Sequence, residues 1–196
     1  MVKQYEVITL EKESDQVSDF FACEDEVYLI TKTVEGESLE EVIKREGIMD
    51  EGKIIPIMRE ILGILDYLHN EEPVILYGEI SPSSIIISSD GKANLKSVDL
   101  EKTYKVGSPY APVEQVSGMA ETRSDIYSLG ATAYFALTGK EPSSVDFKPL
   151  REFNSKISPE FEGIISKSLK LKASERFSSA MEMEEKLDSL EKMNSE

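Results

Sequence analysis

The sequence predicts an α+β fold that is mainly α, in which helices surround one central buried helix. Three observations support this fold class. Extended segments are short and lie near the start of the chain and around an Asp90-Gly91 turn. Helical periodicity dominates the remainder. The segment from Ser124 to Thr138 carries apolar residues on every side, so its helix must be buried all round.

Each remaining element is predicted from local pattern. Strand-like runs flank the acidic turn Glu24-Asp25-Glu26, and Asp90-Gly91 indicates a small hairpin. Ser38 begins a short helix that ends at Gly47, and Asp50 is a cap for a long amphipathic helix whose first turns Pro56 is expected to disturb. The predicted strands are 5–10, 19–23, 27–31, 84–88 and 93–97, the later helices are 158–171 and 178–193, and 98–121 is an ordered loop.

Composition excludes several classes of function. The formal net charge is −16, from 38 acidic and 22 basic residues, which disfavours binding to nucleic acid or to an anionic membrane. Cys23 is the only cysteine and His69 the only histidine, so a disulfide, a Ser-His-Asp triad and a histidine-rich metal site are not expected. Without a signal pattern or an apolar run of about 18 residues, the sequence predicts a cytoplasmic protein.

Four stretches, taken in order, resemble the protein kinase family, in the style of the bacterial Ser/Thr kinases. They are Tyr28 to Gly36 (last N-lobe strand and hinge), Leu65 to His69 (end of the long helix), Gly107 to Gln115 (end of the activation segment) and Arg123 to Gly130 (start of the buried helix). The resemblance implies two parts. Residues 1–33 would be a remnant of the N-lobe strands with the hinge, and residues 34–196 a kinase-like helical C-lobe.

The resemblance also implies residues that hold the fold. The final glutamate of the family's Ala-Pro-Glu motif pairs with a late arginine, which here implies a pair between Glu114 and Arg176. The family aspartate that opens the buried helix holds the backbone amides of the catalytic loop. Asp125 occupies that position, so three structural site residues are expected.

The catalytic positions depart from the family pattern. The loop reads Tyr77-Gly78-Glu79 where the family has His-Arg-Asp, so Glu79 stands at the catalytic base. Ser81 replaces the lysine that steadies phosphate, and Ser84 replaces the metal-binding asparagine. Family spacing places Ser97 at the metal-binding aspartate of Asp-Phe-Gly. A neutral hydroxyl is a poor substitute for a carboxylate that binds a hard dication.

The start of the chain also departs from the family. The 31 residues before Lys32 contain no Gly-x-Gly-x-x-Gly motif and leave no room for a complete N-lobe. From these departures we expect a catalytically inactive pseudokinase, which is not an enzyme and needs neither ATP nor magnesium. Its function would be regulatory, through a protein partner that is a second copy of the chain or an active kinase.

Two alternatives remain open at this stage. In the first, the chain is a minimal active or ATP-binding Ser/Thr kinase whose missing elements come from a partner chain or from atypical ligands, with Asp99 and Glu101 as the candidate acidic pair. In the second, it is a scaffold that senses ATP without catalysis. ATP with Mg²⁺ would raise the melting temperature in the first case, and ATP alone would do so in the second.

Overall fold

Three N-terminal strands form a small sheet at one end of the chain's fold. We describe a computed structural model that covers residues 7–8, 17–23, 26–31, 34–78, 80–96, 108–142 and 147–194, with side chains for 34–78, 80–96, 108–142 and 147–190. The strands are β1 (Val7–Ile8), β2 (Val17–Cys23) and β3 (Glu26–Thr31). β3 lies in the centre, parallel to β1 and antiparallel to β2. The two longer strands occur where the sequence predicted them. The proposed boundary at residue 33 stays a prediction.

A second sheet joins the start of the helical part to the predicted hairpin. It has the order β4 (Gly36–Ser38), β5 (Ile85–Ser88) and β6 (Ala93–Leu95), and both pairings are antiparallel. The predicted hairpin is present, and Gly91 makes its turn with a φ of +85° that suits glycine. Strand β4 was not predicted. Gly36 is required in it because a Cβ there would collide with the carbonyl of Ile87.

Local capping explains where the first two helices begin. Helix α1 (Leu39–Glu46) begins with a capping box, in which Ser38 and Glu41 satisfy each other's backbone amides. Helix α2 (Glu51–His69) begins at Asp50, whose carboxylate accepts from the Lys53 amide at 2.9 Å. Helix α2 is continuous through Pro56. The expected disturbance by Pro56 therefore does not delay the start of the helix at Glu51.

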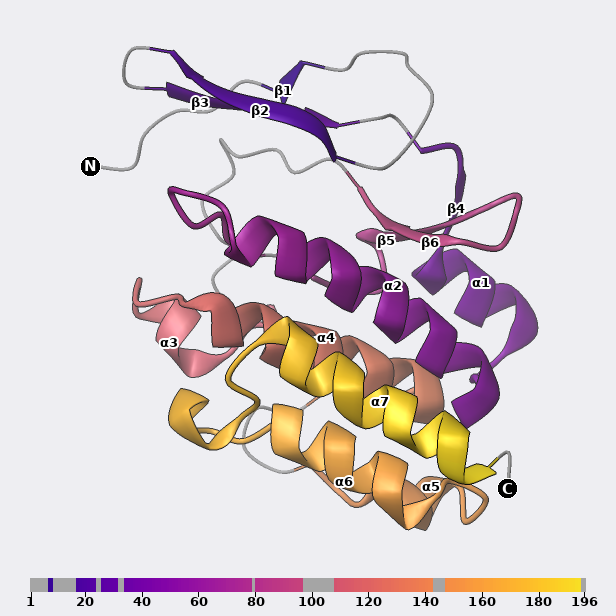
Figure 1. Ribbon diagram of the computed structural model, residues 1–196. Coiled ribbons are helices and arrows are strands. Elements are labelled where there is room, and N and C mark those ends of the chain that lie inside the picture. Colours follow the sequence, from indigo (N-terminus) through magenta and orange to yellow (C-terminus); the bar gives the residue numbers. More distant parts are fainter. Residues whose placement is uncertain are drawn as a thin grey trace.

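Helix α4 (Thr122–Thr138) is the central buried helix that the sequence predicted. It packs against α2, α6 (Pro159–Ser168) and the short α5 (Leu150–Phe153), while α7 (Ala180–Asn194) covers α2 and α6 (Figure 1). All but three of the 17 residues of α4 are buried. The predicted loop before α4 contains an unpredicted short helix, α3 (Val113–Val116). A 3₁₀ turn (Ala173–Glu175) precedes α7.

One polar contact ties the start of α2 to the start of α6. The two carboxylate oxygens of Glu51 accept from the amide and the hydroxyl of Ser158, at 2.8 and 2.7 Å, across 107 residues of sequence. Ser158 also caps α6 through the Phe161 amide. Within the described ranges, no helix combines the length and the apolar character needed to cross a membrane.

Candidate functional site

Asp125 holds the loop that precedes the β5–β6 hairpin. Its carboxylate is 1% exposed and accepts from the backbone amides of Tyr77 (2.9 Å) and Gly78 (2.7 Å). Nε2 of His69, the last residue of α2, lies 2.9 Å from Oδ2 of the same carboxylate. Asp125 lies in the first turn of α4, where the helix dipole favours negative charge. These contacts offset the desolvation of a buried carboxylate and fix the backbone at Tyr77 and Gly78.

The carbonyl group of Gly78 is held from the opposite direction. Nε2 of Gln115, a residue of α3 that is 5% exposed, donates to the Gly78 carbonyl oxygen. The φ angle of Gly78 is +80°, a conformation that a side-chain-bearing residue rarely adopts. Glycine therefore suits the backbone at this position, and both of its polar backbone groups are bound by side chains of distant elements.

A serine-rich turn continues the loop into β5. The Ser84 hydroxyl donates to the Ser81 carbonyl at 3.0 Å and accepts from the Ser81 amide at 2.9 Å. The hydroxyls of Ser81 and Ser83 lie 3.1 Å apart. The Pro82 carbonyl accepts from the Glu40 amide at 3.0 Å, which connects the turn to α1. The hydroxyl of Ser84 is thus engaged within its own turn.

Glu114, the residue before Gln115 in α3, forms an ion pair with Arg176. Arg176 is 4% exposed and donates from Nη1 and Nη2 to the two oxygens of Glu114, at 2.5 and 3.2 Å. Arg176 also donates to the carbonyl groups of Lys170, Leu171 and Arg123, so its guanidinium group is fully engaged. The Ser124 hydroxyl donates to Glu114 at 2.9 Å.

This environment shifts the pKa values of two ionisable groups, Glu114 and Tyr127. Burial alone would raise the pKa of Glu114, but the hydrogen bonds from Arg176, the charge of Arg176 and the Ser124 hydroxyl outweigh it and hold that pKa below its usual range. Burial raises the pKa of Tyr127 to about 12, although the guanidinium of Arg176 lies over its ring at 4.8 Å. Glu114 is therefore ionised and Tyr127 neutral at physiological pH.

The structure brings some of the sequence-derived site residues together and leaves others undescribed. The segment that leads into β5 contains Tyr77, Gly78, Ser81 and Ser84. Glu79 and Ser97 fall outside the described residues. Asp125 meets this segment directly. Glu114 and Arg176 form their pair next to α3, which reaches the segment through Gln115.

Two residues of this arrangement were missed by sequence reasoning. Gln115 directly follows Glu114 in the recognised motif, and His69 closes the recognised end of the long helix. Their positions in those motifs were the available signal. Their partners lie 37 and 56 residues away in sequence, so no local pattern could show the contacts.

The described residues do not form a metal site. No group of three or more His, Cys, Asp or Glu side chains that could hold a metal occurs in the part of the chain that the structure describes. At the family's asparagine position, Ser84 offers a neutral hydroxyl that already serves Ser81. Magnesium prefers carboxylate oxygens and phosphates, so these residues do not fit the ion.

A family model described as the protein kinase domain matches residues 15–187. The chain belongs to this family. Among curated relatives, it is 29% identical to the serine/threonine-protein kinase PknA of Nostoc sp., over 86% of this chain and 34% of the relative. It is also 29% identical to serine/threonine-protein kinase B of Synechocystis sp., over 88% of this chain and 34% of the relative. The chain spans about a third of the length of these curated relatives.

Solved structures show the same fold. The apo form of PpkA-294 superposes with a TM-score of 0.69 at 24% identity, over 87% of this chain and 66% of that one. A crystal structure of Rad53 in complex with AMP-PNP superposes with a TM-score of 0.66 at 23% identity, over 86% of this chain and 48% of that one. The kinase-like fold class predicted from sequence is confirmed.

Two expectations from the sequence are wrong. The expectation that the chain is not an enzyme is overturned by the family match and by relatives that are named Ser/Thr protein kinases. The expectation of no cofactor is overturned by the same family match and relatives, because kinases of this family use ATP and magnesium. Both expectations were inferred from the substituted catalytic positions and from the short stretch before Lys32.

Proposed function

We propose that this chain is an ATP-binding lobe of a Ser/Thr protein kinase, completed by a protein partner or by a further segment of the same polypeptide. The observation that carries the proposal is the grip of Asp125 on the amides of Tyr77 and Gly78. Desolvating a carboxylate costs several kcal/mol unless donors compensate it. These contacts fix the backbone of the loop at Tyr77 and Gly78. In the family, the corresponding loop holds the substrate.

Glu79 lies in the sequence between two residues whose positions are fixed. Gly78, before it, is bound through its amide and its carbonyl, and Ile80, after it, is 1% exposed in the core. Glu79 stands at the catalytic base position and keeps a carboxylate, which can accept a proton from an acceptor hydroxyl. Phosphoryl transfer depends mainly on positioning and charge stabilisation, and ATP with its magnesium ions supplies the phosphoryl group in the family.

The partner is proposed to be a protein. The printed sequence contains no Gly-x-Gly-x-x-Gly, so a roof over the phosphates has to come from outside these 196 residues. A net charge of −16 disfavours nucleic acid and anionic membrane surfaces as partners. An active kinase fits this requirement, whereas a second copy of the chain would bring the same sequence without the motif.

Nucleotide binding is the direct test. The melting temperature of the full chain would be measured with increasing ATP, with and without Mg²⁺, and with GTP for comparison. At 100 times the dissociation constant a ligand stabilises the native state by about 2.7 kcal/mol. For a chain of this size that is a rise of roughly 5–10 °C. An unchanged melting temperature at millimolar ATP, together with no retention of ATP in equilibrium dialysis, contradicts the proposal.

A further inference from the structure

The loop presents a charge problem for a phosphate ligand. Ser81 stands where the family has the lysine that steadies phosphate, and the net charge of −16 repels a nucleotide triphosphate. The neighbouring hydroxyls of Ser83 and Ser84 are neutral. Binding of phosphates here therefore requires a cation from another element close to the loop.

The strand register places Lys96 beside Ser84. In the β5–β6 pair Ile85 faces Leu95, so the next pair along the hairpin is Ser84 with Lys96. The Lys96 amide donates to the Ser84 carbonyl at 2.8 Å, which extends the ladder by this pair.

Ser84 and Lys96 are less buried than the last strand pair beside them. Ile85 and Leu95 are 0% and 9% exposed and belong to the core cluster. Ser84 and Lys96 lie next to these two residues, just outside β5 and β6, where Ser84 is half-buried and Lys96 is exposed. The Lys96 carbonyl accepts from the hydroxyl of Tyr77 at 3.0 Å. The Lys96 backbone is therefore tied to the catalytic loop at both ends of that loop.

The side chain of Ser84 leaves room for the longer lysine. Ser84 is a short residue, and both hydrogen bonds of its hydroxyl return to Ser81. In the family a longer asparagine occupies this position. Ser84 is shorter and its hydroxyl returns to Ser81, so it takes up less space in front of the loop. Lys96 has a flexible four-carbon side chain that ends in an ammonium group.

The charge of Lys96 acts on an acidic neighbour, Glu41. Glu41 begins α1, and its carboxylate accepts from the amide and the hydroxyl of Ser38 at 2.8 and 2.7 Å. Ser38 pairs with Ile86, one strand away from Lys96 in the same sheet. Hydrogen bonds from Ser38 lower the pKa of Glu41, and the charges of Lys44 and Lys96 contribute. The charge of Lys96 therefore reaches the start of α1.

We propose that Lys96 is the phosphate-binding lysine of this chain, supplying from β6 the ammonium group that Ser81 does not supply from the loop. The ligand class is the polyphosphate of an adenine nucleotide, so the assignment rests on the proposed function.

The test compares ATP with adenosine. Dissociation constants of both ligands would be measured by calorimetry for the full chain and for Lys96→Ala, Lys96→Arg and Lys92→Ala. Lys92 is a matched control, because it is an exposed lysine of the same hairpin and lies opposite Ser88. The three residues of β6 separate it from Lys96, and the four steps along the strand span about 13 Å.

The expected result is selective for phosphate. Lys96→Ala weakens ATP binding by roughly 10-fold or more and leaves adenosine binding unchanged, while Lys96→Arg keeps part of the ATP affinity. Lys92→Ala binds both ligands as the wild type does. If Lys96→Ala binds ATP as tightly as the wild type, or loses adenosine equally, the assignment of Lys96 is wrong. Wild-type protein that binds neither ligand overturns the proposed function itself, and the assignment with it.

Discussion

Arg176 and Glu114 lie 62 residues apart in sequence and form a two-pronged ion pair, in which the arginine side chain is fully buried. The pair ties the turn before α7 to helix α3. Because Arg176 also donates to the backbone carbonyl groups of Lys170, Arg123 and Leu171, a single substitution there would break several contacts at once.

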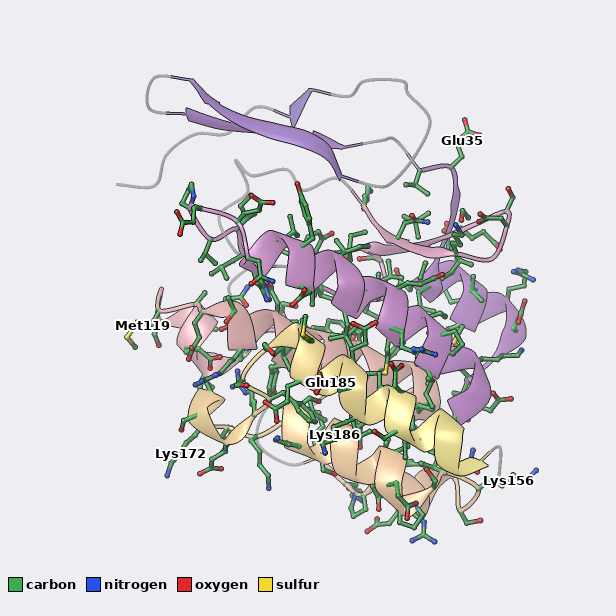
Figure 2. The ribbon with its side chains drawn as sticks, in the orientation of Figure 1. Glu35, Met119, Lys156, Lys172, Glu185 and Lys186 are labelled. Atoms are coloured by element: carbon green, nitrogen blue, oxygen red, sulfur yellow. The ribbon has the colours of Figure 1, made fainter. Side chains whose placement is uncertain are left out.

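Replacing Arg176 with alanine is expected to destabilise the protein by about 3–5 kcal/mol, since Glu114 is left as an uncompensated, largely buried charge. The free energy of unfolding from urea titration measures the effect. Lys172→Ala is the matched control, because that side chain is 76% exposed and projects from the same turn (Figure 2). Its cost should stay below about 0.5 kcal/mol. Equal losses in the two variants would contradict the importance of the pair.

The variant Asp125→Asn tests whether Asp125 fixes the loop backbone at Tyr77 and Gly78. The substitution keeps the shape of the side chain but replaces one acceptor oxygen with a donor that opposes a backbone amide. We expect a loss of stability of about 2–4 kcal/mol. We also expect faster hydrogen exchange at the amides of Tyr77 and Gly78 than at amides within α4. Exchange that stays equally slow at both loop amides would show that Asp125 does not hold them.

Two glycine-to-alanine substitutions should act in opposite directions. A Cβ at Gly130, in α4, would meet the hydroxyl of Ser168 and lie 2.9 Å from its Cβ, whereas a Cβ at Gly63, in α2, meets nothing within 4 Å. Gly130→Ala should cost about 1–3 kcal/mol through overpacking. Gly63→Ala should stabilise the protein by about 0.4–1 kcal/mol, because alanine favours the helix.

A second substitution isolates the cause of the loss at Gly130. Ser168→Gly removes both atoms that the new Cβ would meet. The double variant Gly130→Ala with Ser168→Gly should therefore lose less than the sum of the two single variants, by about 0.5–3 kcal/mol in a double-mutant cycle. Additive losses would place the cause outside the contact between α4 and α6.

Acid should weaken the protein in part through Glu182. Hydrogen bonds from Lys167 and Ser178 lower the pKa of Glu182 from 4.5 to about 2. A carboxyl group whose pKa is lower in the folded state adds stability above its unfolded pKa, and that stability disappears as the pH falls. The contribution of Glu182 is therefore complete above pH 4.5 and is lost as the pH falls towards 2.

The variant Glu182→Gln measures that contribution. It should lower the free energy of unfolding at pH 7 by about 0.3–1 kcal/mol, since Glu182 is partly exposed and water screens the pair. The difference from wild type should shrink below pH 4.5. Glu185→Gln, on the outward surface of α7 (Figure 2), is the control and should change neither the stability nor its pH dependence. A constant difference between Glu182→Gln and wild type at all pH values would contradict the linkage.

Several features of the site could be read from the sequence, and the reason is local. Glu114, Asp125 and Arg176 each stand in a motif whose neighbours fix their register, so their positions could be assigned without coordinates. The β5–β6 hairpin was predicted from its turn, although β6 ends at Leu95 rather than at residue 97. Helix α3 was missed because four residues are too few to show a helical period.

The sequence by itself determined the family, the order of the elements and the burial of α4, because apolar periodicity, caps and turn residues act between neighbours along the chain. The tertiary structure decided what reaches Gly78 and which lysine stands beside Ser84. Those contacts join residues of separate elements, and their geometry depends on how helices and strands pack rather than on any local pattern.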